Sequence, residues 1–254
     1  MNKKIFIAFS IALCAVTLLY AKKKTEETIS GGQESNYILI TFLYNEIIPA
    51  RIEEYIICME TNIQHKKIQR IHVLYDITWD NKSQKQTILD YLLRQPKITI
   101  DYIEGRPTYG MCFALANDLY QNSNIILANA DIFFNETLSL LDNYDLTNKF
   151  LALTRWNLHK DGSIQPYYII HHGVRREQHC SQDAWIFQTP FPKLLKDNIA
   201  IGVQACDMRI AYWANKSGLK VINPCLSIQC IHVHTSGIRH YGKVNLPSDI
   251  LVTP

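Results

Sequence analysis

Between residues 37 and 128, short apolar runs alternate with segments of helical periodicity. The runs span 37–43, 71–75, 98–102 and 125–128. The run 37–43 is almost continuously apolar, as in a strand buried on both faces of a parallel sheet. This β-α-β-α-β-α-β order predicts an α/β fold with a mostly parallel central sheet and helices on both faces.

The segments between these runs carry apolar side chains on one helical face. Pro49 suits the first turn of a helix, and 82–93 is expected to form a second helix that ends before Pro96. The apolar face of the first helix is predicted from Ile52, Ile56, Met59 and Ile63, and that of the third from Tyr109, Phe113, Ala116 and Tyr120.

In the second half of the chain this alternation is weaker. Strands are expected at 151–154 and 184–187, with a polar, histidine-rich loop between them. A helix is expected over 203–217, and short strands at 221–222 and 230–234. The length of this region and the preceding one together suits one domain.

A different kind of segment precedes this domain. An apolar run from Ile5 to Ala21 has lysines on both sides and lies at the short end of what spans a bilayer. We interpret 1–24 as an uncleaved signal anchor, 25–36 as a polar stalk and 37–254 as the folded domain. The expected location is a single-pass attachment to a membrane, with the domain in the Golgi or ER lumen or at a bacterial inner membrane. Cleavage of 1–21 as a signal peptide, which would give a secreted protein, is the alternative.

Charge and cysteine content narrow the classes of partner. The chain has 26 Lys and Arg against 23 Asp and Glu, for a formal charge of +3. Part of this excess is N-terminal, so the body is near neutral and a nucleic-acid partner is not expected. The seven cysteines include no C-x-x-C pair, so they are read as buried thiols or a few disulfides.

Several common α/β chemistries are excluded by missing motifs. The sequence has no G-x-G-x-x-G after the first strand, no G-x-x-x-x-G-K-[ST], no G-x-S-x-G and no H-E-x-x-H. What remains is polar residues at strand ends, where open α/β sheets bind ligands. Asp76 ends the second expected strand, and Asn129-Ala130-Asp131 follows the fourth.

Asp131 is a candidate metal ligand. A carboxylate in a turn just past a buried strand can hold a divalent cation that keeps waters and binds substrate phosphates. Asn129 can add a neutral oxygen or a hydrogen bond. The alternative is that Asp131 caps the next turn, since Asp is a good N-cap. His232 and His234 have the same parity on an expected strand and therefore face one side, where they can share a metal, His234 being preferred, or make ordinary hydrogen bonds.

Together, these stretches resemble the GT-A-fold glycosyltransferases of the nucleotide-diphospho-sugar transferase superfamily. Ile40-Thr-Phe-Leu-Tyr-Asn-Glu46 is similar to the first strand of that family and its nucleotide-facing loop, and Asn129-Ala-Asp131 to its variable D-x-D motif. Gly202-Val-Gln-Ala-Cys-Asp207 resembles the acidic helix start, with Cys206 in place of the usual Glu. His232-Val-His234 lies where many members have a metal-binding His.

The resemblance implies a single GT-A-like (Rossmann-like) domain and a set of site residues. In that reading Asp131, His234 and His232 bind Mn²⁺ or Mg²⁺, and Asp207 is the catalytic base. The residues implied to bind the nucleotide sugar are Thr41, Tyr44, Asp76 and Asn129. The activity implied is transfer of a sugar from a nucleotide-diphosphate sugar to a hydroxyl of a glycan, lipid or protein acceptor.

Two further residues are proposed on chemical grounds. Arg106 can make a bidentate contact with the leaving diphosphate, or it can be an ordinary surface arginine. A carboxylate must take the proton from the attacking hydroxyl; Asp207 is the first choice for this base and Asp183 the second. With Asp207 as base, the reaction is expected to invert the anomeric centre.

Two other classes of protein stay open. One is a zinc-stabilised binding module, because Cys225, Cys230, His232 and His234 are potential zinc ligands close in sequence. The other is a sugar nucleotidyltransferase on a similar sheet. Enzymes of that class use a Gly-rich loop with a Lys or Arg, and 43–47 supplies neither.

Overall fold

The structure is a computed structural model that describes residues 36–79, 86–171, 174–177 and 181–238. The anchor expected at 1–24 and the stalk expected at 25–36, apart from its last residue, lie outside the described residues. Within the described part, no helix has the length and apolar character needed to cross a bilayer.

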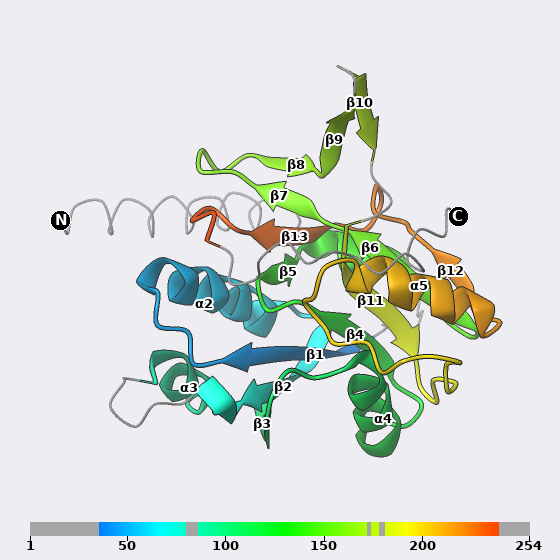
Figure 1. The fold of residues 1–254 in the computed structure, drawn as a ribbon, viewed down its shortest axis with the longest axis horizontal. Coiled ribbons are helices and arrows are strands. Elements are labelled where there is room, and N and C mark those ends of the chain that lie inside the picture. The colour runs from blue at the N-terminus through cyan, green and yellow to red at the C-terminus, as the bar shows by residue number, and fades with distance from the viewer. Residues whose placement is uncertain (1–35, 80–85, 172–173, 178–180, 239–254) are drawn as a thin grey trace, which may run out of the picture. The chain divides into compact units, whose positions relative to one another are not determined.

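Strands and helices alternate in the first half as expected, and short strands dominate the second half (Figure 1). The strands are β1 (Tyr37–Tyr44), β2 (Ile68–Asp76), β3 (Ile98–Ile103), β4 (Asn124–Ala128), β5 (Ile132–Phe134), β6 (Lys149–Thr154), β7 (Trp156–Leu158), β8 (Ile164–Pro166), β9 (Tyr168–His171), β10 (Val174–Glu177), β11 (Gln182–Gln188), β12 (Lys220–Ile222) and β13 (Cys230–Val233). The helices are α2 (Pro49–Gln64), α3 (Thr87–Leu92), α4 (Tyr109–Leu119) and α5 (Cys206–Lys216), with short 3₁₀ turns at Ile77–Trp79 and Glu136–Leu141.

The central sheet has the strand order β12-β6-β11-β4-β1-β2-β3. The pairs β1–β2, β2–β3, β1–β4 and β6–β12 are parallel, which confirms the mostly parallel sheet. However, β11 runs antiparallel to both β4 and β6, so the sheet is mixed. The parallel strands end at one edge: the last residues of β1 and β2, Tyr44 and Asp76, are register partners.

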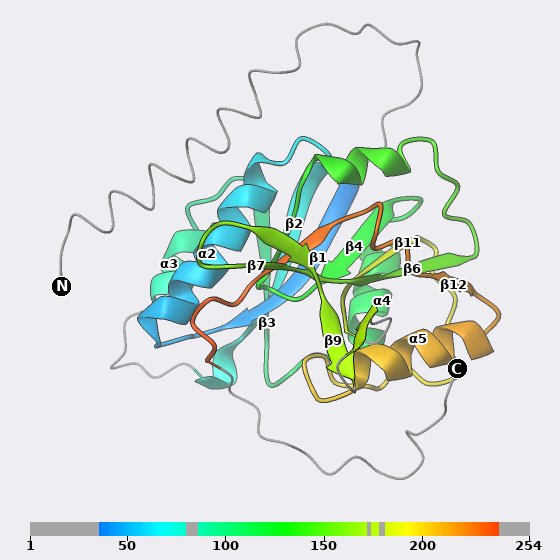
Figure 2. The ribbon, with the colours of Figure 1, turned by 90° about the horizontal axis from the view of Figure 1, so that it is seen from above.

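Two apolar layers cover the faces of this sheet (Figure 2). Along β1, Leu39 and Leu43 belong to the layer with α2 and α3, whereas Ile38 and Ile40 belong to the layer with α4 and α5. This alternation explains the continuous apolar run in the sequence, because both faces of the strand are buried.

A smaller sheet, in the order β5-β13-β7-β8, brings segments that are distant in sequence to the edge of the main sheet at which the parallel strands end. This edge is called the ligand edge below, because open α/β sheets bind ligands there. In it β13 is antiparallel to β5 and parallel to β7. Asn62 of α2 fixes β5 from the other side: its amide donates to Ile132 O (2.9 Å) and accepts from Phe134 N (3.1 Å). These buried bonds join α2 to the strand that follows Asp131.

Besides the antiparallel β11, the expected elements differ from the structure in several places, among them the later start of α5 at Cys206. The polar loop between 154 and 184 is in fact occupied by β7–β8 and β9–β10, two antiparallel pairs. The predicted face of α2 is wrong by about one position: Met59 is buried, but Ile52, Ile56 and Ile63 are only half-buried. The residues that α2 buries are Arg51, Glu54, Tyr55, Cys58, Met59 and Asn62.

Candidate active site

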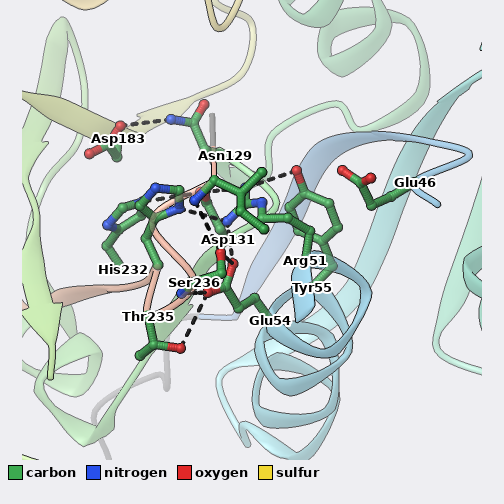
Figure 3. Close-up of polar contacts among 12 residues, drawn as sticks. Glu46, Arg51, Glu54, Tyr55, Asn129, Asp131, Asp183, His232, Thr235 and Ser236 are labelled. Carbon is green, nitrogen blue, oxygen red and sulfur yellow. Dashed lines mark hydrogen bonds and ion pairs between the residues drawn. The ribbon is translucent and has the colours of Figure 1, made fainter. Parts of the chain in front are cut away.

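Asp131, His232 and His234 lie together at the ligand edge of the main sheet. Potential ligand atoms of the three side chains are all within 4.8 Å of one another. The ladder between β5 and β13 makes this proximity possible, because Val233 N donates to Asp131 O (2.9 Å). Figure 3 shows Asp131 and His232 side by side, with His232 Nε2 3.2 Å from Asp131 Oδ2.

The protonation of this cluster suits a cation. Burial works against the charged form of Asp131, but His232 and Arg51 outweigh it and hold the pKa of the carboxyl well below its usual range. Burial, together with the nearby His232 and Arg51, lowers the pKa of His234 to about 4. At neutral pH, Asp131 is therefore an anion and His234 a neutral imidazole, the forms that ligate metals.

The donor set fits a divalent metal. One carboxylate and two imidazoles suit Mn²⁺ better than Mg²⁺, which prefers oxygen ligands. His234 Nε2 is buried and has no hydrogen-bond partner among the described residues. A buried polar atom without a partner is costly, so it marks a place where a bound group is accommodated.

Helix α2 supplies polar side chains that the sequence analysis did not select. Arg51 Nη2 donates to Asp131 Oδ2 (3.0 Å) and to Tyr55 Oη (2.9 Å), while Nη1 lies 2.8 Å from His234 Nδ1. Nη1 also bonds to Glu54. Positions 51, 54 and 55 lie on the helical face that also carries Cys58, Met59 and Asn62. Two charged residues on a face that packs against the core are unusual, and this was the signal in the sequence that could have indicated a site.

Glu54 connects α2 to the segment that follows β13. It accepts hydrogen bonds from Ser236 N (2.7 Å), Ser236 Oγ (3.1 Å) and Thr235 Oγ1 (3.3 Å) (Figure 3). Because Thr235 directly follows His234, this carboxylate also fixes the position of the histidine.

Asn129 and Asp183 form a second group beside the first. The register pairs Ala128 with Ala184, and Asn129 Nδ2 donates to Asp183 Oδ1 (2.7 Å). Arg155 Nη1 donates to the other oxygen, Oδ2, at 2.9 Å. Both oxygens of Asp183 are thus engaged, and the adjacent arginine stabilises its charge.

Asp207 lies in the first turn of α5 and accepts from Gln182 N at 3.1 Å. Burial, followed by the negative charge of Asp183, raises the pKa of Asp207 to about 6. A helix N-terminus favours a carboxylate, so burial and like charge outweigh that effect here. Carboxyl groups with such raised pKa values are typical of acid–base sites.

Of the predicted nucleotide-binding residues besides Asn129, Thr41 is buried within β1. Tyr44 Oη donates to Glu46 Oε2 (3.1 Å) and lies 3.4 Å from Tyr55 Oη, so it joins the α2 network.

The other two residues of the predicted set, Asp76 and Arg106, form hydrogen bonds that hold loops in place. Asp76 Oδ1 accepts from Thr78 and from Gly105 N (2.9 Å), which fastens the loop after β3 to the end of β2. Arg106 Nη1 donates to Ile201 O (3.1 Å) and Gly202 O (3.0 Å), so it fixes the loop before α5. Gly202 has a φ of +74°, a left-handed conformation that favours glycine, and a Cβ there would also lie 2.7 Å from Arg106 Nη1.

The cysteines of the suggested zinc set do not join the metal cluster in the described structure. Cys230 is fully buried, and its Sγ contacts the carbonyl oxygens of Leu153 (3.7 Å) and Thr154 (3.6 Å). This geometry gives no support to a structural zinc site.

No protein-family model matches the chain, and no curated protein sequence matches it. Among solved structures, GalNAc-T7 with UDP, GalNAc and Mn²⁺ matches with a TM-score of 0.51 and 10% identity, over 79% of this chain and 44% of that chain. The mannosyltransferase PcManGT from Pyrobaculum calidifontis, in complex with GDP-Man and Mn²⁺, gives 0.49 and 15% over 92% and 69%. S. aureus TarS 1-349 gives 0.40 and 12% over 79% and 58%.

The likeness to GalNAc-T7 concerns the fold, because 10% identity is too low to carry function. It confirms the GT-A-like α/β fold expected from the sequence resemblance. The chain spans less than half of the length of that protein.

The raised pKa of Asp207 predicts that Asp207→Asn stabilises the protein at neutral pH. Because the pKa is about 6 in the folded state and 3.8 for an ordinary Asp, the unfolded state loses its proton first as the pH rises. Stability from this group is therefore lost as the pH rises from about 4 to 6. At pH 7 the variant should gain on the order of 2 kcal/mol, and at pH 3.5 nothing.

Chemical denaturation at both pH values measures this difference. Asp118→Asn, an exposed change on α4, is the matched control and should stay within about 0.5 kcal/mol of wild type. An equal effect of Asp207→Asn at both pH values would contradict the electrostatic origin.

Proposed function

We propose that the chain is a metal-dependent glycosyltransferase that moves a sugar from a nucleotide-diphosphate sugar to a hydroxyl acceptor. The observation that carries the proposal is the Asp131, His232 and His234 cluster at the edge of a GT-A-like sheet. Open α/β sheets bind ligands at this edge. The GalNAc-T7 structure that the chain resembles in fold was determined with UDP, GalNAc and Mn²⁺.

The cluster would hold the metal, Mn²⁺ or Mg²⁺, through one carboxylate and two imidazoles. A bound divalent ion supplies Lewis-acid stabilisation of the charge that develops on a diphosphate leaving group. Asp131 contributes the anion and His234 a neutral ring with a buried, unpartnered nitrogen.

The donor is proposed to lie along the ends of β1, β2 and β4. Tyr44, Asp76 and Asn129 mark these ends, and Thr41 lies below them in β1. Arg106 borders the same edge through the loop before α5. The proposed acceptor is a hydroxyl of a glycan, lipid or protein.

Asp207 is proposed as the general base, and the structure favours it over Asp183. Asp183 has both oxygens engaged by Asn129 and Arg155, so it is poorly placed to receive a proton. Asp207 accepts from Gln182 N but is not ion-paired with an arginine as Asp183 is, and its pKa of about 6 lies near the operating range of a base. Asp183 then acts on Asp207 through its negative charge. With a single carboxylate base, the reaction is expected to invert the anomeric centre.

Metal-dependent donor binding should depend on Asp131. A selective nucleotide sugar with Mn²⁺ should raise the melting temperature of the wild-type chain by mass action. Asp131→Asn keeps the size of the side chain but removes the charged ligand, so the Mn²⁺-dependent part of the shift should disappear. A thermal-shift screen of UDP- and GDP-sugars with and without Mn²⁺ measures it, with Asp118→Asn as control. An undiminished shift in Asp131→Asn would refute the metal assignment.

Turnover should depend on Asp207 while donor binding does not. The amide of Asp207→Asn can still accept from Gln182 N but cannot take a proton, so the rate should fall by about 100-fold or more. Release of nucleoside diphosphate from the donor found in the screen gives the rate, and calorimetry gives the affinity. Wild-type turnover in this variant would move the base to Asp183 or elsewhere.

The N-terminal segment is proposed to anchor this enzyme to a membrane, with 25–36 as the stalk and 37–254 as the catalytic domain. The basis is the apolar run from Ile5 to Ala21 between lysines. N-terminal sequencing of the mature protein tests it: a start at Met1 agrees with an anchor, and a start near Lys22 would show a cleaved signal peptide and a secreted protein.

A further inference from the structure

We propose that Arg51 competes with the divalent ion for Asp131 and His234, so that the site exchanges between an arginine-closed and a metal-loaded state. This inference rests on the metal-binding part of the proposed function. It does not depend on which sugar is transferred.

Arg51 contacts two of the three candidate metal ligands. Nη2 donates to Asp131 Oδ2 at 3.0 Å, and Nη1 lies 2.8 Å from His234 Nδ1. The arginine is only 5% exposed, and both contacts are partly buried and charge-assisted. In Figure 3 the side chain of Arg51 extends from α2 toward Asp131.

The position of the proton on the His234 ring makes the arginine-closed and metal-loaded states mutually exclusive. A guanidinium has donors and no acceptor, so the nitrogen that faces it must carry the lone pair. Nδ1 is therefore the acceptor, and in a neutral imidazole the proton is then on Nε2. A metal at Nδ1 must displace Arg51, whereas a metal at Nε2 requires the proton to move to Nδ1, which then opposes the N–H of Arg51. Either way, the bond between Arg51 and His234 breaks.

Electrostatic repulsion between Arg51 and the ion also makes the two states exclusive. A guanidinium and a divalent ion on the same carboxylate repel each other, and water screens them little because the Asp131 side chain is only 14% exposed. Glu54 gives the arginine an alternative partner. It bonds to Arg51 Nη1 and is itself held by Ser236, so Arg51 keeps a counter-ion when it leaves His234. The closed state thus opens without leaving a buried charge unpaired.

A supporting role for Arg51 makes the opposite prediction. If Arg51 merely held Asp131 and His234 in place for the metal, its removal would weaken Mn²⁺ binding. Competition predicts tighter binding. The sign of the change in Mn²⁺ affinity therefore separates the two roles.

The experiment is a Mn²⁺ titration of the full chain without nucleotide, followed by the electron paramagnetic resonance signal of free aqueous Mn²⁺. Arg51→Gln should bind Mn²⁺ about tenfold more tightly or better. The double variant Arg51→Gln with Glu54→Gln restores the wild-type net charge and should stay tighter than wild type. Arg155→Gln removes an equal charge that acts on Asp131 without bonding to it, so any tightening should be smaller than in Arg51→Gln and within about threefold.

Three results would overturn the proposal: unchanged or weaker binding in Arg51→Gln, equal tightening in Arg155→Gln, or no Mn²⁺ binding by any of these proteins. Wild-type protein gives a measurement that does not depend on the variants folding. Nitrogen NMR of the metal-free chain should show His234 with its proton on Nε2, and a proton on Nδ1 would refute the closed state. Because neither assay includes a donor, loss of the competition would leave sugar transfer to be judged by its own turnover assay.

Discussion

One carboxylate oxygen, Asp131 Oδ2, holds the functional edge of this structure together. It lies within hydrogen-bond distance of Arg51 on α2 and His232 on β13, while its own residue precedes β5. A buried anion needs compensating charge or hydrogen bonds. The need to pair this one atom therefore fixes three elements relative to one another. The same need explains why a cation, whether guanidinium or metal, belongs at this position.

Two neighbouring carboxylates, those of Asp183 and Asp207, lie in different environments. Asp183 is ion-paired with Arg155 and bonded to Asn129, so its charge is stabilised. Burial and the negative charge of Asp183 disfavour the charged form of Asp207 and raise its pKa to about 6. Environments that separate two acids in this way are typical of acid–base chemistry. The negative charge on Asp183 thus contributes to the raised pKa of Asp207.

The sequence predicted the parts of the molecule that depend on local pattern. The parallel strands β1 to β4 and the polar residues at their ends follow from buried apolar runs and chain order. The antiparallel direction of β11 could not be predicted from the sequence, because a short apolar strand has the same pattern in either orientation. The α2 face was misjudged since its stripe includes Arg51 and Glu54, which a hydrophobicity pattern excludes. Their burial depends on partners, Asp131 and Ser236, that are distant in sequence.

The two positions at which the sequence differs from the glycosyltransferase motifs that it resembles have local physical explanations. Asn129 replaces the first acid of the D-x-D motif, and its amide donates to Asp183 Oδ1 at 2.7 Å. A carboxylate at that position would face another carboxylate at hydrogen-bond distance, which is strongly unfavourable unless one is protonated. Cys206 replaces a Glu, and its thiol is buried against the Tyr109 hydroxyl (3.5 Å) in the core layer with α4. A charged side chain there would be buried without a partner of opposite charge. Asn129 is thus matched to Asp183 and Cys206 to Tyr109, and both substitutions leave Asp131 and Asp207 at the ligand edge.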